Sequence, residues 1–304
     1  MENRVINFMG IAKPTALISL ALVLLSIVSL AVKGLVLGLD FTGGTSLELE
    51  FSKPPEIKEV REVLAESGFD KAVVQTFGAD TAVLVRLQQD LTDTLGPQVV
   101  GALKGLDDKV ALSKADYVGA QVGEELREDG GLGLLLALLS ILVYVSMRFQ
   151  FKFSVGAVVA LIHDVTITLG CFSIMGWEFN LNVLAAILAL IGYSLNDTIV
   201  VFDRIRENFR KLRKETPVSI INISLTETLS RTIVTSLGTL FTVFALFLFG
   251  GEALDGFSRA LIVGILVGTY SSIYIASNLT LMMNVSSEDL MEPVKEGAQF
   301  DDRP

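Results

Sequence analysis

Six long runs of apolar residues alternate with short polar segments along most of this chain. Each run is close to the length of about 20 residues that a helix needs to cross a bilayer. The runs cover Pro14–Val32, Gly130–Met147, Phe153–Trp177, Phe179–Phe202, about Thr228–Gly251 and Ala260–Ser287. Three of them carry internal charge, so the pattern is not purely hydrophobic. We predict an all-α membrane bundle of six transmembrane helices.

Residues 40–129, between the first two runs, follow a different pattern. Apolar and polar residues alternate there with the period of strands, and two stretches have the apolar stripe of a helix. The expected elements are strands at 46–51, 72–77, 81–87 and 109–118, with helices at 56–66 and 92–103. The order β-α-β-β-α-β is that of a split ferredoxin-like motif. We therefore predict an α+β ferredoxin-like domain, and its scattered acidic residues favour a docking or binding module over a catalytic one.

Composition supports a membrane protein and excludes several classes. Hydrophobic residues make up 51% of the 304 residues and charged residues only 19%, with a mean hydropathy of +0.58, so a water-soluble enzyme is not expected. Residues 40–129 hold 18 acidic and 9 basic residues, which accounts for most of the net charge of −10 and argues against a nucleic-acid partner. Cys171 and His163 are single, so we expect no internal disulfide, no metal cluster and no cofactor.

The distribution of Lys and Arg over the short loops predicts the orientation. The segments 148–152 and 203–215 hold two and six basic residues, whereas the opposite loops 176–182 and 250–259 hold none and one. Cytoplasmic loops are enriched in basic residues. We expect a cytoplasmic N-terminus and first span at 1–39, an extracytoplasmic domain at 40–129, five further spans at 130–287 and an acidic, disordered cytoplasmic tail at 288–304.

Asp197 and Arg231 are the buried charges that the sequence most directly brings together. Asp197 lies six residues before Asp203, hence about 9 Å inside the cytoplasmic boundary. If the fifth helix begins near Ile221, Arg231 lies about 15 Å from its start. An ionisable residue in a membrane usually has a partner or a function. We predict an Asp197–Arg231 ion pair.

Polar residues extend around both charges. On the fifth span they recur at helical spacing, and on the fourth they flank Asp197. They are Thr228, Thr235, Thr239 and Thr242 on the fifth span, and Tyr193, Asn196 and Thr198 on the fourth. Such a stripe could pass protons, although Ser and Thr in membranes commonly just satisfy backbone groups. With an Asp and an Arg on it, we favour the proton-pathway interpretation.

Other intramembrane residues leave alternatives open. Asp164 is expected to face the bundle, either as a member of a proton relay or as a structural hydrogen-bonding group. His163, its neighbour, points about 100° away on a helix and is expected to be structural. Gly264 and Gly268 form a small-xxx-small face that predicts helix packing. The basic run 204–214 is expected to fix the orientation of the chain in the membrane and to contact lipid headgroups. Docking of a cytoplasmic partner is the lesser alternative.

Several short motifs occur in a fixed order along the chain. They are GLDFTGGT (38–45), YVGAQVGEEL (117–126), ALIHDV (160–165), SLNDTIVVFDRIREN (194–208), SRT (230–232) and FGG (249–251). In this order they resemble the SecF subunits of the SecD/SecF family, within the resistance-nodulation-division superfamily. Ala120 stands where the usual family run has a proline. In the first motif the glycines at Gly38, Gly43 and Gly44, with Asp40, predict a tight structural exit from helix to strand.

The resemblance implies a function that composition alone does not. It implies a non-enzymatic subunit of the Sec translocase in the bacterial inner membrane, driven by the proton motive force. It also implies as partners a SecD-like subunit, the SecYEG channel, the translocating preprotein and, in a wider assembly, YajC and YidC. In such proteins the Asp and Arg matching Asp197 and Arg231 belong to the proton pathway; Asp164, Asn196, Thr198 and Thr235 are further expected members.

Two other functions fit the same pattern of spans. One is a proton-driven exporter of lipids or small solutes built on the same scaffold. Such exporters usually have two large outer loops per chain, whereas this chain has one. The other is an assembly factor that stabilises a channel without transporting anything. Recovery of a SecD-like chain or the channel in mild detergent would favour the export function over both.

Overall fold

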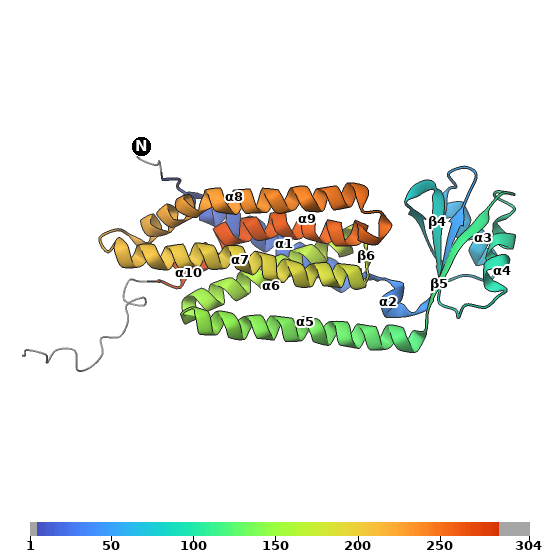
Figure 1. Ribbon diagram of the computed structural model, residues 1–304, viewed down its shortest axis with the longest axis horizontal. Coiled ribbons are helices and arrows are strands. Elements are labelled where there is room, and N and C mark those ends of the chain that lie inside the picture. Colours follow the sequence, from blue (N-terminus) through green and yellow to red (C-terminus); the bar gives the residue numbers. More distant parts are fainter. Residues whose placement is uncertain (1–4, 286–304) are drawn as a thin grey trace, which may run out of the picture.

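The computed structural model describes residues 5–285, and within them six helices are long and apolar enough to cross a membrane. They lie side by side, and a small domain extends from one end of the bundle (Figure 1). The predicted combination of a six-helix membrane bundle with an α+β domain is confirmed. The first five are α1 (Ala12–Val32), α5 (Ala120–Arg148), α6 (Phe151–Met175), α7 (Leu181–Lys211) and α8 (Pro217–Phe249).

The sixth span is interrupted by a π-helical turn. It consists of α9 (Glu252–Ser271), the π turn η2 (Ser272–Ala276) and α10 (Ser277–Met282). Single π turns inside α-helices occur frequently at functional sites. At the other end of the chain, a 3₁₀ turn η1 (Met9–Ile11) precedes α1.

The centre of the bundle is formed by α6, α7 and α9. At least half of the residues in their most apolar segments are buried, against fewer than a fifth in α1, α5 and α8. Glycines allow the closest approach: a Cβ on Gly264 of α9 would lie 2.4 Å from the Leu190 side chain of α7. The small-xxx-small face therefore packs helices, as the sequence indicated.

The outer domain is a four-stranded antiparallel sheet in the order β3-β4-β2-β5. Its elements are β2 (Gly44–Glu50), α3 (Ile57–Glu66), β3 (Val73–Phe77), β4 (Ala79–Leu87), α4 (Leu95–Leu103) and β5 (Ala111–Val118). Leu47 of β2 pairs with Val85 of β4, and both are completely buried against Val60 and Leu64 of α3 and Val99 of α4. This sheet and its two helices form the predicted split motif with a hydrophobic core of its own.

Three short elements at the junction with the membrane part were not predicted. The strand β1 (Val36–Leu37) pairs in parallel with β6 (Glu178–Phe179), and the single-turn helix α2 (Leu39–Thr42) follows β1. Elements of two to four residues have too little periodicity for a sequence pattern to indicate them.

Helix boundaries differ from the apolar runs where a helix continues into water. α5 begins at Ala120, ten residues before the predicted span, and its first turns carry the charged segment 124–129. α8 begins at Pro217 because the Thr216 hydroxyl accepts from Ser219 N at the N-cap and proline suits the first helical position. The expected acidic tail at 288–304 lies outside the described residues.

Candidate functional site

Asp197, in the middle of α7, is held by hydroxyl groups from two other helices. Thr232 Oγ1 of α8 donates to its Oδ1 at 2.7 Å, and Ser272 Oγ of η2 donates to its Oδ2. The side chain is only 9% exposed. Within residues 5–285, no Lys, Arg or His lies within ion-pair distance of this carboxylate, although the structure places it inside a membrane-spanning helix.

Asp164 on α6 forms a second buried carboxylate site nearby. Ser194 Oγ of α7 and Ser271 Oγ of α9 donate to its Oδ2 at 2.5 and 3.0 Å, and Nδ1 of His163 lies 2.9 Å from its Oδ1. Asp164 is completely buried. Each oxygen of the carboxylate therefore has a partner, and Asp164 joins α6, α7 and α9; the choice between a proton relay and a structural group stays a prediction.

The two carboxylate sites are connected through α7 and α9. Ser271 and Ser272 are consecutive residues at the start of the π turn, and one bonds Asp164 while the other bonds Asp197. Gly268 makes room for this arrangement, because a Cβ there would lie 3.2 Å from Ser194 Cβ and 3.5 Å from Asp164 Oδ2. Rearrangement of the π turn would therefore change the hydrogen bonding of both carboxylates.

The predicted ion pair between Asp197 and Arg231 is wrong. Arg231 is exposed on the outer face of α8, and its neighbour Thr232 faces Asp197 instead. Successive residues on a helix point about 100° apart, so an estimate of depth that is correct to one residue can still select the wrong face. Ser271 and Ser272 were missed because serines in a span give no distinctive sequence signal.

The polar residues around the two charges divide between a buried and an exposed face. Thr198 is buried and donates to the Ser194 carbonyl at 3.2 Å, whereas Asn196 is exposed. Thr235 is exposed and donates to backbone carbonyls of its own helix, as Thr239 and Thr242 also do. Thr228 is buried but likewise bonds its own backbone. None of these four stripe threonines is seen to bond Asp197 among the described residues; the bond comes from Thr232, which the predicted stripe did not include.

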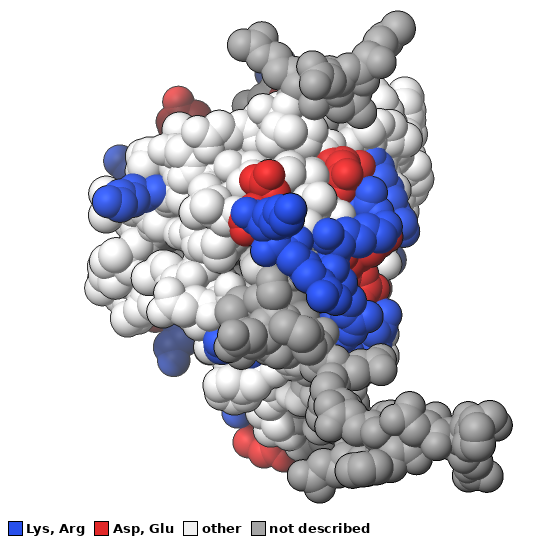
Figure 2. Space-filling model, turned by 90° about the vertical axis from the view of Figure 1, so that its left-hand side faces the viewer, with Lys and Arg blue, Asp and Glu red and all other residues white. Residues whose placement is uncertain are grey.

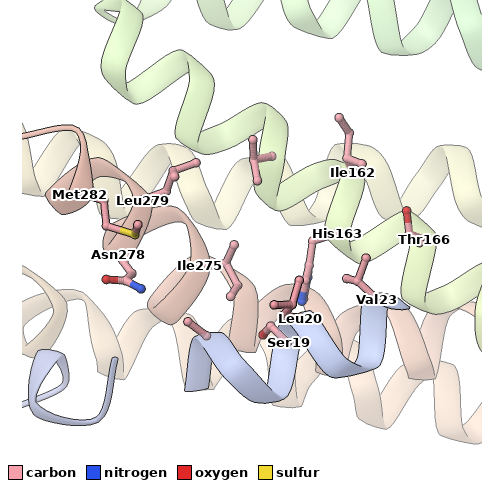
Figure 3. A pocket seen from close by; sticks show the side chains of 12 residues that line it. Ser19, Leu20, Val23, Ile162, His163, Thr166, Ile275, Asn278, Leu279 and Met282 are labelled. Atoms are coloured by element: carbon pink, nitrogen blue, oxygen red, sulfur yellow. The ribbon is translucent and has the colours of Figure 1, made fainter. Parts of the chain in front are cut away.

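His163 lines an apolar pocket of about 290 Å³ between α1, α6 and α10 (Figure 3). Its ring points toward Ser19 and Leu20 of α1 and stacks on Tyr270 with ring centroids 6.5 Å apart. Nε2 has no hydrogen-bond partner among the described residues. His163 therefore contacts both Asp164 and Tyr270, and its expected structural role stays a prediction.

The glycine motif forms the joint between the outer domain and the bundle. Gly38 N donates to the Phe179 carbonyl at 2.8 Å, and Asp40 Oδ2 accepts from Leu181 N, at the start of α7, at 2.9 Å. Gly43 and Gly44 have φ of 65° and 113°. A Cβ on Gly43 would lie 2.6 Å from Ala120 Cα at the start of α5. The motif thus permits a backbone crossing that other residues would obstruct.

An ion pair fixes the outer sheet to the same joint. Arg86 of β4 binds Glu178 of β6, and both side chains are largely buried. Burial lowers the pKa of the Arg86 guanidinium, and the negative charge of Asp40 opposes this effect.

Among residues 5–285, no three His, Cys, Asp or Glu side chains gather to hold a metal ion.

Comparisons with known proteins agree with this architecture. Residues 98–286 match the family described as "Protein export membrane protein SecD/SecF, C-terminal", and residues 28–55 match the SecD/SecF GG motif. The protein translocase subunit SecF of Vibrio alginolyticus is 50% identical, with the alignment covering 99% of this chain and 98% of that protein. The corresponding subunit of Pseudomonas aeruginosa is also 50% identical, over 98% of both chains.

A solved structure has the same fold. The crystal structure of SecDF, a translocon-associated membrane protein of Thermus thermophilus, matches with a TM-score of 0.84 at 38% identity. The match covers 93% of this chain and 39% of the longer SecDF chain. A second SecDF structure, in a super-membrane-facing form, matches with a TM-score of 0.70. The chain belongs to the SecD/SecF family of protein-export membrane proteins.

Proposed function

We propose that this chain is a SecF-type subunit of a protein translocase that uses proton movement across the membrane to promote polypeptide export. The observation that carries the proposal is the environment of Asp197. A carboxylate at the centre of a membrane helix costs roughly 2.5–3.5 kcal/mol on insertion scales when charged. Hydroxyls of Thr232 and Ser272 accompany it, with no cation in ion-pair distance among the described residues.

This environment supports a proton carrier rather than a permanent ion pair. A hydroxyl group can donate to a carboxylate and can accept from a carboxylic acid, so Thr232 and Ser272 can bond either form of Asp197. Asp164 is completely buried and contacts the ring of His163, which supports a positioning role beside the pathway. Within the pathway, we assign proton binding to Asp197 and the accompanying hydrogen bonds to Thr232 and Ser272.

The exposed face of α8 supports a membrane partner. Arg231 is exposed there and is the one charged residue of the segment 228–249, and Thr235 and Thr242 lie exposed on the same helix. A guanidinium facing lipid is unfavourable, so such residues normally face protein or a water-filled cavity. We propose that a SecD-like subunit covers this face and supplies a polar or acidic group to Arg231. Arg231 would then pair with a group of the partner subunit, and not with Asp197 of its own chain.

The remaining assignments follow from this proposal. The basic loops lie at the end of the bundle opposite the outer domain (Figure 1), which supports cytoplasmic termini and an inner-membrane location. The SecYEG channel and the preprotein are the proposed larger partners, with YajC and YidC in a wider assembly. The outer domain, anchored beside the start of α7, is the part we expect to contact emerging polypeptide.

Export of a secreted reporter in cells depleted of this chain tests the proposed function. Complementation should raise the rate of a late step in export, and a protonophore should remove this gain. In parallel, mild-detergent isolation of the tagged chain should recover a SecD-like subunit. A lipid or solute exporter would instead leave reporter export unchanged. An assembly factor would raise the amount of channel, but the increase in export rate would not depend on the proton gradient.

A further inference from the structure

A basic pocket lies at the end of the bundle opposite the outer domain. Figure 2 views this end directly, and basic side chains gather there in a continuous strip. The cavity has a volume of about 330 Å³ and lies between the C-terminal end of α5 and the last turns of α7. It is lined by Arg148, Asp203, Arg206, Glu207, Arg210 and Lys211.

Two guanidinium groups in this pocket share one aromatic ring. The Cζ atoms of Arg148 and Arg206 lie 5.4 and 5.3 Å from the centroid of Phe149, which is 5% exposed. Asp203 accepts from Arg148 Nη2 at 3.0 Å and from Arg206 Nη1 at 3.4 Å. The buried ring and the shared carboxylate therefore hold two positive groups, from different helices, close to each other.

Basic side chains outnumber acidic ones in the lining of the pocket. Four basic and two acidic side chains line it. Glu207 is also engaged by Arg204, outside the pocket, at 2.6 Å. Arg206 Nε is buried without a hydrogen-bond partner among the described residues. Arginine forks of this kind match the geometry of a phosphate.

The surroundings of the pocket indicate that such a phosphate comes from a lipid. The outer face of α5 is apolar up to the edge of the pocket, with Tyr144 51% and Met147 84% exposed. A lipid whose tails lie along this face would place its headgroup beside Arg148. Basic pockets between transmembrane helices on the cytoplasmic side are known to bind anionic headgroups. An unspecific positive-inside loop would not require two arginines to converge on one buried ring.

We propose that this pocket binds the phosphodiester headgroup of an anionic membrane phospholipid, such as phosphatidylglycerol, between α5 and α7. Arg148 and Arg206 are the primary contacts, and Lys211 adds positive charge at the rim. Bound lipid would hold α5 against α7, the helix that carries Asp197. Asp197 and Arg206 are nine residues apart on this helix, or about 14 Å. The binding itself does not depend on the proposed export function.

Lipid binding to the full chain tests the proposal. The probe is phosphatidylglycerol, measured by native mass spectrometry against phosphatidylcholine of the same chain length. The double variant Arg148→Gln/Arg206→Gln should lower phosphatidylglycerol affinity about tenfold, the loss expected from removing charge-assisted hydrogen bonds. The matched control Arg213→Gln/Lys214→Gln removes two charges from the same loop outside the pocket and should change affinity less than about twofold.

Three results would overturn the proposal. One is an equal loss of affinity in both double variants, which would indicate unspecific attraction to a basic loop. Another is equal affinity for the two lipids. The third is competition by inorganic phosphate at concentrations similar to those of the lipid, which would identify a site for a soluble anion. If the Gln variant does not fold, Arg148→Lys/Arg206→Lys keeps the charge without the fork and should still weaken phosphatidylglycerol binding; unchanged binding would contradict an arginine-specific site.

Discussion

Single residues at the helix crossings determine how closely the elements of this protein approach. Gly43 and Gly34 both have positive φ, 65° and 70°, so an L-residue is strained at either position. Only at Gly43 would a Cβ also meet backbone, 2.6 Å from Ala120 Cα, whereas nothing lies within 4 Å at Gly34. The motif glycine is thus required by a close crossing in addition to its dihedral angle.

This difference predicts unequal effects for the same substitution. Gly34→Ala should cost only the strain of a left-handed conformation, about 1–2 kcal/mol. Gly43→Ala should cost clearly more, because the start of α5 must also move. Thermal melting of the two purified variants, with wild type as reference, measures the effect. Equal melting temperatures for the two variants would show that the crossing at Ala120 is unimportant.

Thr232 and Thr235 provide a second comparison at the residue scale. Thr232 donates to Asp197, while Thr235 donates only to carbonyls of its own helix. Thr232→Val keeps the shape of the side chain but removes the donor, so export per assembled complex should fall about tenfold, as expected for a bond to a charged group. Thr235→Val should stay within about twofold of wild type. A similar loss in both variants would contradict the assignment of Thr232 to the site.

At the scale of elements, the periodicity of apolar residues predicted the regular strands and helices. All four strands and both helices of the outer domain were expected within a few residues, since six or more consecutive positions carried each signal. The hydroxyl cage of Asp197 was not expected. Asp197 and its two hydroxyl donors lie on three different helices, and their contact depends on helix rotation. Apolar runs in a membrane leave this rotation undetermined, because lipid-facing and buried positions are both apolar.

A contact between the turn after α4 and the segment after β2 gives a pH-dependent prediction. Asp107 Oδ2 accepts from Ser52 Oγ and N at 2.7 and 2.6 Å, and its Oδ1 accepts from Lys109 N at 2.9 Å. These bonds, the Ser52 hydroxyl first, hold the pKa of Asp107 below its usual value. A lowered folded-state pKa stabilises the domain fully above the unfolded value of about 4. That contribution is lost as the pH falls through the lower, folded-state value.

Urea unfolding of the fragment 40–129 at pH 6 and pH 3 measures this contribution. The fragment should fold alone because its core is separate from those of the bundle. Asp107→Asn should lower the urea midpoint at pH 6 and lose less stability than wild type between the two pH values. Parallel pH dependence in the variant and wild type would show that Asp107 does not contribute, and a random-coil fragment would contradict an independent outer domain.

At the scale of the whole molecule, α7 connects three regions. Its first residue, Leu181, donates to Asp40 in the glycine motif, and Asp197 lies 16 residues later, about 24 Å along the helix. Arg206 in the basic pocket follows on the same helix. Under the proposed function, a change in the hydrogen bonding of Asp197 would reach the anchor of the outer domain through this helix. The sequence indicated each region separately, but their alignment on one continuous helix emerged only from the fold.

The proposed subunit interface predicts protection of the exposed face of α8. In a chain carrying Cys171→Ser, Thr242→Cys lies three turns from Arg231 on the same face, and Leu135→Cys lies on exposed α5. A membrane-permeable maleimide should label the α8 cysteine more slowly when the SecD-like subunit is co-expressed, since the partner then covers it. Labelling of the α5 cysteine should not change. Protection of α5 instead of α8 would place the partner on the other side.

The central claim is that Asp197 carries a proton during export, and Asp197→Asn tests it most directly. The amide keeps the size of the side chain and accepts at least one of the two hydroxyl bonds, but it cannot titrate. Complex abundance and gradient-dependent export are measured together in the same membranes. We predict normal abundance, with the gain from the gradient reduced to that of membranes lacking the subunit. Full gradient-dependent export from a well-assembled Asp197→Asn complex would contradict the account.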